Sequence, residues 1–198
     1  MNLSLFDFDG TITKKDSFID FIIYAVGLIN FILGIFFLSP ALLAFKLKII
    51  PNWKAKELFL SYFFKGWNKL DFDIWVSRYS KEKLPNIIRQ KALDRIQWHK
   101  MQGDKIVIVS ASMESWLKEW CEKYDLELIS TKLEIKNNKI TGKILNKNCY
   151  GIEKVKRIRE KYNLEDYDII YAYGNSSGDK EMLGLANEKY FNWVKLDA

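Results

Sequence analysis

Two aspartates near the start of the chain, Asp7 and Asp9, end a short apolar run and precede a Gly-Thr pair. In an extended chain, side chains two positions apart point to the same side, so both carboxylates are expected on one face. Neighbouring buried carboxylates repel each other, and a hard divalent ion such as Mg²⁺ is a natural partner for them. A strand end whose carboxylates are solvated is the plainer alternative. The spacing therefore predicts a cation site if other polar groups converge on it.

Further polar groups follow apolar runs that are typical of strands. Ser110 ends the β-branched run that starts at Lys105, and Asn175 and Asp179 follow the apolar run 168–173. Alternating strands and helices predict a parallel α/β sheet, and such sheets bind ligands at the carboxyl ends of their strands. We therefore expect these groups to meet the two aspartates at one edge of the sheet.

A long helical stretch separates the first expected strand, Leu3–Phe8, from the second. Further along, two short strands flank Asn137-Asn138, a pair that favours a hairpin turn. Helices are expected over 18–45, 53–64, 72–79, 86–101, 114–123, 153–162 and 179–186.

We predict an α/β fold with a Rossmann-like parallel core and an inserted α-helical cap. Residues 1–16 and 101–198 are expected to form the core, and residues 17–100 the cap. The cap would lie over the strand ends that carry the polar groups.

The whole-chain composition favours anionic partners, because the net charge of the 198 residues is +6. Phosphate esters, anionic lipid surfaces and nucleic acid all qualify, but no nucleic-acid recognition motif accompanies the charge, so no nucleic-acid partner is expected. Cys121 and Cys149 are typical of free thiols in a reducing cytosol. The two early aspartates interrupt any secretory signal, and we expect a cytoplasmic protein.

Four segments occur in the order of the four sequence motifs of the haloacid dehalogenase (HAD) superfamily. They are Asp7-Phe8-Asp9-Gly10-Thr11, Val109-Ser110-Ala111-Ser112, Gly151-Ile152-Glu153-Lys154 and Gly174-Asn175-Ser176-Ser177-Gly178-Asp179. The chain resembles this superfamily from Leu3 to about Leu183. Its insertion directly after the first motif resembles the subclass with a helical cap there, as in phosphoserine phosphatases and phosphatidylglycerophosphatase C.

The resemblance implies a phosphomonoester hydrolase that works through an aspartyl-phosphate intermediate. Asp7 would be the nucleophile, and Asp9 the general acid and then the general base. Ser110 and Lys154 would bind the phosphoryl oxygens as negative charge develops. The alternatives are a helix N-cap role for Ser110 and a solvated position for Lys154.

The resemblance also implies Mg²⁺ as the cofactor, with Asp7, Asp9, Asn175 and Asp179 as the metal site. Many members of the superfamily have an acid where this chain has Asn175. An amide oxygen can still bind a hard cation, but the site carries one negative charge fewer. We expect Asn175→Asp to change metal affinity more than the maximal rate.

The apolar segment Phe21–Leu38 carries no charge and is long enough to cross a bilayer. A single crossing would separate Asp7 from Ser110 and Lys154, and lysines flank the segment on both sides, which favours one location for both ends. Two alternatives remain: a membrane hairpin that turns near Asn30–Gly34 or Ser39–Pro40, or a buried pair of cap helices.

Contact with a membrane through residues 18–50 would make a lipid phosphate the natural substrate. The main hypothesis is therefore a phosphatase for a lipid such as phosphatidylglycerophosphate at the cytoplasmic face of the inner membrane. The alternative is a soluble phosphatase for a small metabolite such as phosphoserine or histidinol phosphate.

Overall fold

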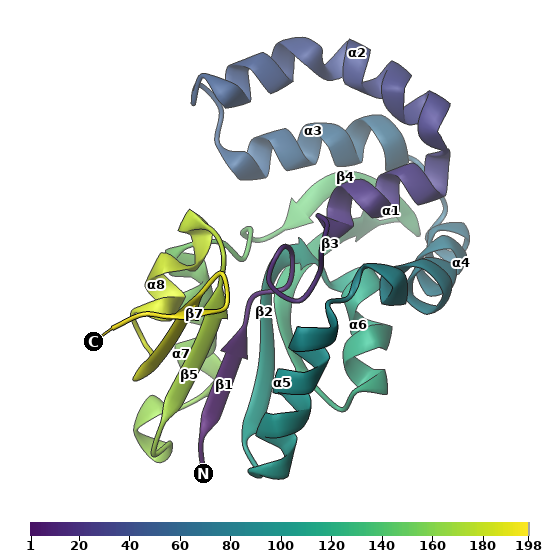
Figure 1. Ribbon diagram of the computed structural model, residues 1–198. Helices are drawn as coiled ribbons and strands as arrows, with labels where there is room; N and C mark the ends of the chain where they lie inside the picture. Colours follow the sequence, from purple (N-terminus) through teal and green to yellow (C-terminus); the bar gives the residue numbers. More distant parts are fainter. Residues whose placement is uncertain (198) are drawn as a thin grey trace.

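Residues 1–197, which the computed structural model describes, form a seven-stranded sheet with helices on both faces (Figure 1). The strand order is β4-β3-β2-β1-β5-β6-β7. The five strands from β3 to β6 are parallel, and the edge strands β4 and β7 are antiparallel to their neighbours. This confirms the predicted α/β class. The strands are β1 Leu3–Phe6, β2 Lys105–Met113, β3 Glu127–Lys136, β4 Lys139–Leu145, β5 Ile170–Gly174, β6 Glu188–Phe191 and β7 Val194–Lys195.

The central strands are buried on both faces, which explains their nearly continuous apolar sequences. Leu3 and Leu5 pack with the residues of α7 (Ile152–Lys161) and α8 (Lys180–Leu183). Phe6 belongs to the core on the other face, under α5 (Gln90–Met101) and α6 (Glu114–Lys123). The alternation of side chains along β1 therefore separates two apolar layers.

The inserted helices lie between β1 and β2 in the chain and form the predicted cap above the carboxyl ends of the strands (Figure 1). Single turns at Tyr79–Lys83 and Leu84–Ile87 then lead back to the sheet. The cap helices are α1 Ser17–Val26, α2 Leu28–Lys46, α3 Asn52–Phe64 and α4 Lys69–Arg78.

The last helix of the insertion, α5, packs on the sheet beside β2. Its His99 is fully buried against Phe6 and Tyr173. The expected boundaries of the cap, at residues 17 and 100, stay a prediction. Helix α5 falls almost wholly within that range, and in the structure it covers the core sheet.

The predicted turns within the apolar segment are wrong, because α2 continues through both positions. The chain instead bends before α2, at Gly27, whose φ of 82° favours glycine. Pro40 lies inside the helix and has no N–H to donate to the carbonyl of Phe36. The hydroxyl of Ser39 donates to that carbonyl instead, at 2.7 Å, which offsets the lost backbone bond.

Helix α2 packs on α3 by one side only, so the expected buried helix pair is also wrong. Gly34 is the one buried residue of α2, and a Cβ there would lie 2.2 Å from the ring of Phe63. Phe31 stacks on the same ring at 6.0 Å between centroids. Helix α2 nevertheless exposes large apolar side chains, at Leu28, Ile29, Ile32, Leu33, Phe36, Phe37 and Leu43.

The β3–β4 hairpin connects the core sheet to the cap. Its turn has positive φ at Asn137 and Asn138, as the sequence predicts, and the strand before the turn, β3, is ten residues long and begins at Glu127. Ser61 of α3 donates to the carbonyl of Gly142 at 3.2 Å. Glu57 of α3 accepts from the N–H of Ile144 at 3.1 Å. The hairpin therefore holds α3 over the strand ends.

Candidate active site

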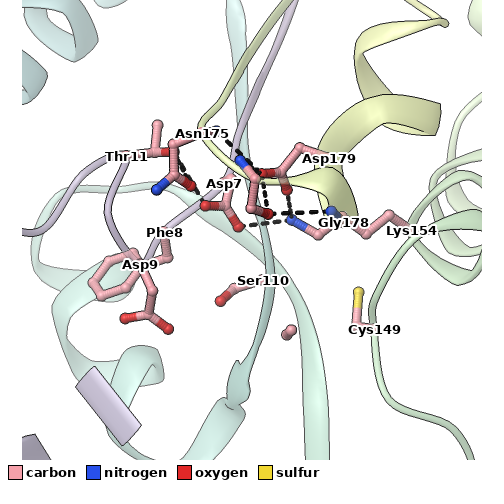
Figure 2. A network of polar contacts seen from close by, with 12 residues as sticks. Asp7, Phe8, Asp9, Thr11, Ser110, Cys149, Lys154, Asn175, Gly178 and Asp179 are labelled. Carbon is pink, nitrogen blue, oxygen red and sulfur yellow. Dashed lines mark hydrogen bonds and ion pairs between the residues drawn. The ribbon is translucent and has the colours of Figure 1, made fainter. Parts of the chain in front are cut away.

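Asp7 lies just beyond β1 in a buried cluster at the carboxyl ends of the central strands (Figure 2). Its N–H donates to the carbonyl of Tyr173 in β5 at 2.9 Å, which fixes the backbone. Lys154, at the start of α7, donates from Nζ to Asp7 Oδ1 and to Asp179 Oδ1, each at 2.7 Å. Lys154 is 1% exposed and Asp7 is 7% exposed, so the solvated alternatives for both residues are wrong.

Burial and charge set the protonation states in this cluster. Burial raises the pKa of Asp7 to about 6, although Lys154 opposes the shift. Burial disfavours the charge of Lys154, but Asp7 and Asp179 together raise its pKa above the ordinary value. Burial likewise works against the Asp179 carboxylate, yet Lys154 and Ser176 hold its pKa below the usual range. Lys154 therefore remains a cation beside the Asp7 carboxylate.

Asp9 points away from this cluster, contrary to the expectation that both carboxylates share one face (Figure 2). Because β1 already ends at Phe6, strand alternation does not set the direction of either side chain. Asp9 Oδ1 accepts from the N–H of Ser17 at 2.7 Å, and Oδ2 accepts from the hydroxyl of Ser112. Burial and the charge of Asp16 raise the pKa of Asp9. The two aspartates thus have separate partners.

Ser110 lies inside β2, the strand next to β1, and is 1% exposed. Its Oγ accepts from the N–H of Ser112 at 3.0 Å, and its own O–H can still donate to a bound anion. The following helix, α6, begins at Glu114 with Met113 as its N-cap. The alternative role of Ser110 as a helix cap is therefore wrong.

Asn175 follows β5 and packs against the loop after β1. Gly10 has a φ of 78°, and a Cβ on it would lie 2.1 Å from the Asn175 amide, so only glycine fits there. The amide fits best with its nitrogen inward, donating to the carbonyl of Asp9 at 3.1 Å and to Asp7 Oδ2 at 3.2 Å. If the amide is rotated by a half-turn, Asn175 Oδ1 instead faces the carbonyl of Asp9 and Asp7 Oδ2. In that orientation the hydroxyl of Thr11 donates to Asn175 Oδ1 at 3.2 Å.

The three oxygens that meet in the second orientation, from Asp7, Asp9 and Asn175, are the kind of donors that a hard cation takes. Within residues 1–197, no three His, Cys, Asp or Glu side chains are grouped as metal ligands. The carboxylate of Asp179 is engaged elsewhere: Oδ1 accepts from Lys154, and Oδ2 accepts from the N–H and the hydroxyl of Ser176 at 2.9 and 2.8 Å. The donors present fit a cation held by a carboxylate, a main-chain carbonyl and an amide. The predicted four-residue ligand set stays a prediction.

The structure adds two residues to which the sequence interpretation gave no role. Thr11 donates to Asp7 Oδ2 at 3.1 Å. Lys56 of cap helix α3 reaches into the site and donates to the carbonyl of Ala111 at 2.9 Å. Burial lowers the pKa of Lys56, while Asp9 and Asp16 act to raise it. Nothing in the sequence of α3 separates this lysine from its exposed neighbour Lys54.

A sequence profile described as haloacid dehalogenase-like hydrolase matches residues 4–184. The chain belongs to this family. The match confirms the predicted superfamily and the hydrolase class, and it covers all four motifs. The matched range also contains every residue of the site described above.

Two curated relatives match over most of the chain. Protein CicA of Caulobacter vibrioides is 33% identical over 189 residues, which cover 94% of this chain and 84% of CicA. The protein named probable phosphatase Rv3661, from Mycobacterium tuberculosis, is 28% identical over 193 residues, which cover 91% of this chain and 64% of that protein.

Solved structures share the fold. A Bordetella pertussis Tohama I protein described as having unknown function superposes with a TM-score of 0.83 at 19% identity, covering 96% of this chain and 89% of that one. A phosphoserine phosphatase structure described as a phospho-aspartyl intermediate analogue superposes with a TM-score of 0.63 at 24% identity, covering 96% and 85%. At these identities the likeness supports the predicted capped α/β fold.

Proposed function

We propose that this protein is a Mg²⁺-dependent phosphomonoester hydrolase that works through an aspartyl-phosphate on Asp7. The observation that carries the proposal is the pairing of the buried Asp7 carboxylate with the Lys154 cation, 2.7 Å away, beside a second carboxyl group with a raised pKa. Membership of the hydrolase family supports it, as do the similarity to the probable phosphatase Rv3661 and the fold shared with phosphoserine phosphatase.

The chemistry follows from the two carboxyl groups. A carboxylate oxygen of Asp7 attacks phosphorus while the bond from phosphorus to the ester oxygen breaks, and protonated Asp9 gives its proton to that leaving oxygen. Water then attacks the phosphorus of the acyl phosphate and gives a proton to Asp9. This second step releases inorganic phosphate and restores the Asp7 carboxylate. Lys154 and Ser110 would bind the phosphoryl oxygens throughout.

The carboxylate of Asp7, the carbonyl of Asp9 and the amide oxygen of Asn175 would hold Mg²⁺. When bound, the ion would supply positive charge to the phosphoryl oxygens. In this proposal Asp179 would contribute by orienting Lys154 and by closing the loop that begins at Asn175, and its predicted place among the metal ligands stays a prediction.

Asn175→Asp tests the metal proposal. An added carboxylate strengthens the attraction for a divalent cation, so half-saturation of p-nitrophenyl phosphate hydrolysis should need about tenfold less Mg²⁺, with little change in the maximal rate. Gln102→Glu, which also exchanges an exposed amide for a carboxylate but lies before β2, at the end of that strand opposite the site, serves as the control. An unchanged Mg²⁺ titration for Asn175→Asp would count against Asn175 as a ligand.

We further propose that the substrate is a lipid phosphate, such as phosphatidylglycerophosphate, reached from the cytoplasmic face of a membrane. Helix α2 supports this, because its most apolar 18-residue stretch has a mean hydropathy of 2.3, yet only 11% of that stretch is buried. It forms the outermost layer of the cap (Figure 1). An apolar helix face of this kind, followed by Lys46 and Lys48 at its C-terminal end, is suited to lie in the interface of an anionic bilayer.

Liposome flotation tests the membrane proposal. The wild type should float with vesicles containing anionic lipid, and the variant Phe36→Asp/Phe37→Asp should remain at the bottom, because it places charge on the lipid-facing side. Leu70→Asp/Ile74→Asp changes two exposed apolar residues of α4 and should float like the wild type. Hydrolysis of p-nitrophenyl phosphate checks that each variant is folded.

If the wild type does not float, the membrane proposal is wrong. Hydrolysis of phosphoserine or histidinol phosphate, with no turnover of a lipid phosphate, would then favour the soluble metabolite phosphatase. The fold shared with phosphoserine phosphatases makes that the second candidate.

A further inference from the structure

A groove with a volume of about 520 Å³ lies between the cap and the core. Pro51 and Trp53 at the start of α3 form the cap side. Tyr150, before α7, and Ile152, the first residue of α7, form the core side. Trp53, Tyr150 and Ile152 are 46%, 40% and 70% exposed, so large apolar side chains face solvent here. The volume is in the range of small-molecule sites.

One end of the groove adjoins the catalytic loops. The Tyr150 hydroxyl shares a hydrogen bond of 3.0 Å with Ser177, two positions before Asp179. The Tyr150 ring packs on Gly178 so closely that a Cβ there would lie 2.2 Å from it. Glu153, which lines the groove, is the neighbour of Lys154 in the chain. A molecule in the groove would therefore lie close to the groups that bind phosphate.

The other end of the groove adjoins the apolar surface of the cap. Pro51 ends the connection between α2 and α3, in which Leu47 and Ile49 are 61% and 71% exposed. This connection continues the exposed apolar side of α2. The groove also has a polar strip, where Asn148 of the core donates to Asn52 of the cap at 3.2 Å.

We propose that this groove binds the glycerol ester and the first acyl carbons of a lipid phosphate, while the phosphate occupies the site at Asp7. The inference rests on the proposed lipid substrate and specifies where it binds. A lipid whose phosphate reaches Lys154 and whose tails stay in the bilayer must pass from the catalytic loops to α2, and the groove joins these two regions. Its apolar walls suit methylene groups, and its asparagine amides can donate to ester carbonyls.

The test compares two soluble substrates, so that vesicle binding plays no part. They are dihexanoyl phosphatidic acid below its micelle concentration and p-nitrophenyl phosphate. The variant Trp53→Gln/Ile152→Gln removes both apolar walls, and Leu70→Gln/Ile74→Gln on α4 is the matched control with exposed apolar residues elsewhere. Groove binding predicts a loss of about tenfold or more in kcat/KM for the phosphatidic acid. For p-nitrophenyl phosphate the change should stay within about twofold.

Equal effects on both substrates, or an unchanged kcat/KM for phosphatidic acid, would overturn the groove proposal while leaving the lipid phosphatase intact. If the wild type hydrolyses p-nitrophenyl phosphate but no phosphatidic acid, the lipid substrate and the groove occupant are both wrong. If it hydrolyses neither substrate with Mg²⁺, the proposed phosphatase activity itself fails.

Discussion

At the scale of single residues, the environments of Asp7 and Asp9 differ more than their spacing suggests. Asp7 is held by the Lys154 cation and by the Thr11 hydroxyl. Asp9 accepts hydrogen bonds from Ser17 and Ser112 and has no contact with Lys154 in the structure. A carboxylate beside a cation suits a nucleophile, and a carboxyl group with a raised pKa suits an acid.

The charge of Asp16 helps to raise the pKa of Asp9, the proposed general acid, and is the second cause of that shift after burial. Asp16→Asn removes that charge but keeps the α1 N-cap, since the amide oxygen can still accept from Phe18 and Ile19. With less repulsion, Asp9 loses its proton at lower pH. Because the first step needs protonated Asp9, the alkaline limb of the kcat/KM profile should move to lower pH.

Asp71→Asn is the control for this experiment, because Asp71 lies in the first turn of α4 and is exposed. Its pH profile should match that of the wild type. An alkaline limb that stays in place, or moves to higher pH, in Asp16→Asn would contradict the coupling between Asp16 and Asp9.

Lys56 is the cap residue that we expect to contribute most to turnover. It places a cation beside the strand end that carries Ser110, where an anionic substrate would bind. Lys56→Met should lower kcat/KM for p-nitrophenyl phosphate about tenfold, as expected for losing one hydrogen bond to a charged group. Lys54 lies two positions earlier in α3, and its side chain is 48% exposed, so Lys54→Met should have little effect on kcat/KM. Equal effects of the two substitutions would show that only the net charge matters.

Sequence patterns could bring Asp7, Ser110, Lys154 and Asp179 together, because each lies within or just after a recognisable strand or near the start of a helix. The direction of Asp9 could not be predicted, since it depends on the strand ending at Phe6 and on partners 8 and 103 positions away. Lys56 could not be singled out, because only the packing of α3 over the sheet brings it to Ala111.

At the scale of elements, the contact between β4 and α3 holds the cap in place. Gly142 has a φ of 80°, and a Cβ on it would lie 2.4 Å from the Ser61 backbone. Gly142→Ala should therefore lower the free energy of unfolding by about 2–3 kcal/mol, from strain and displacement of α3 together. Gly103→Ala has a similar φ of 73° with nothing within 4 Å, and should cost only about 1 kcal/mol. If urea denaturation gives the same loss of unfolding free energy for both variants, α3 moves away from β4 at no cost, and the contact does not hold the cap.

Helix α5 makes the fold sensitive to acid through His99. Its Nδ1 contacts Asp104 at 2.7 Å and its Nε2 contacts the Tyr173 hydroxyl at 2.9 Å. Burial lowers its pKa, while Asp104 opposes and Arg95 assists the shift. At His99 the unfolded chain therefore binds a proton more readily than the folded one. The free energy of unfolding falls as the pH drops below 6.5, the ordinary pKa of a histidine.

His99→Gln should reduce the dependence of unfolding free energy on pH between about 7 and 5, measured by urea titration at several pH values. The comparison of slopes with the wild type matters, because carboxyl groups contribute to both proteins. An unchanged slope would mean that His99 keeps its ordinary pKa in the fold.

Elements with simple periodicity were predictable: α6 has its expected bounds, and the asparagine turn of the β3–β4 hairpin is where the sequence places it. The cap was harder, because α2 is apolar on all sides and has no periodicity to mark its bounds. At Pro40 the hydroxyl of Ser39 occupies the carbonyl that the missing N–H leaves free, a contact that no pattern reveals. The exposure of α2 could be learned only from the packing of α3.

At the scale of the whole molecule, the catalytic cluster lies between the sheet and a cap whose outer layer is apolar (Figure 1). A transmembrane α2 would require the chain on its two sides to occupy opposite compartments, yet Asp7 and Lys154 are in contact. The proposed position of α2, flat in a membrane interface, would bury its apolar side and leave the site assembled. It would also account for an exposed apolar helix in a protein with a net charge of +6.

The most direct test of the central claim is chemical trapping of the phosphate on Asp7. Wild-type protein is mixed with p-nitrophenyl phosphate and Mg²⁺, quenched rapidly and reduced with borohydride, which converts an aspartyl-phosphate into homoserine. Peptide mass spectrometry should find the conversion at Asp7 alone, and the Asp7→Asn variant should show neither conversion nor turnover. Conversion at another residue, or turnover that survives Asp7→Asn, would contradict the assignment of Asp7 as the nucleophile.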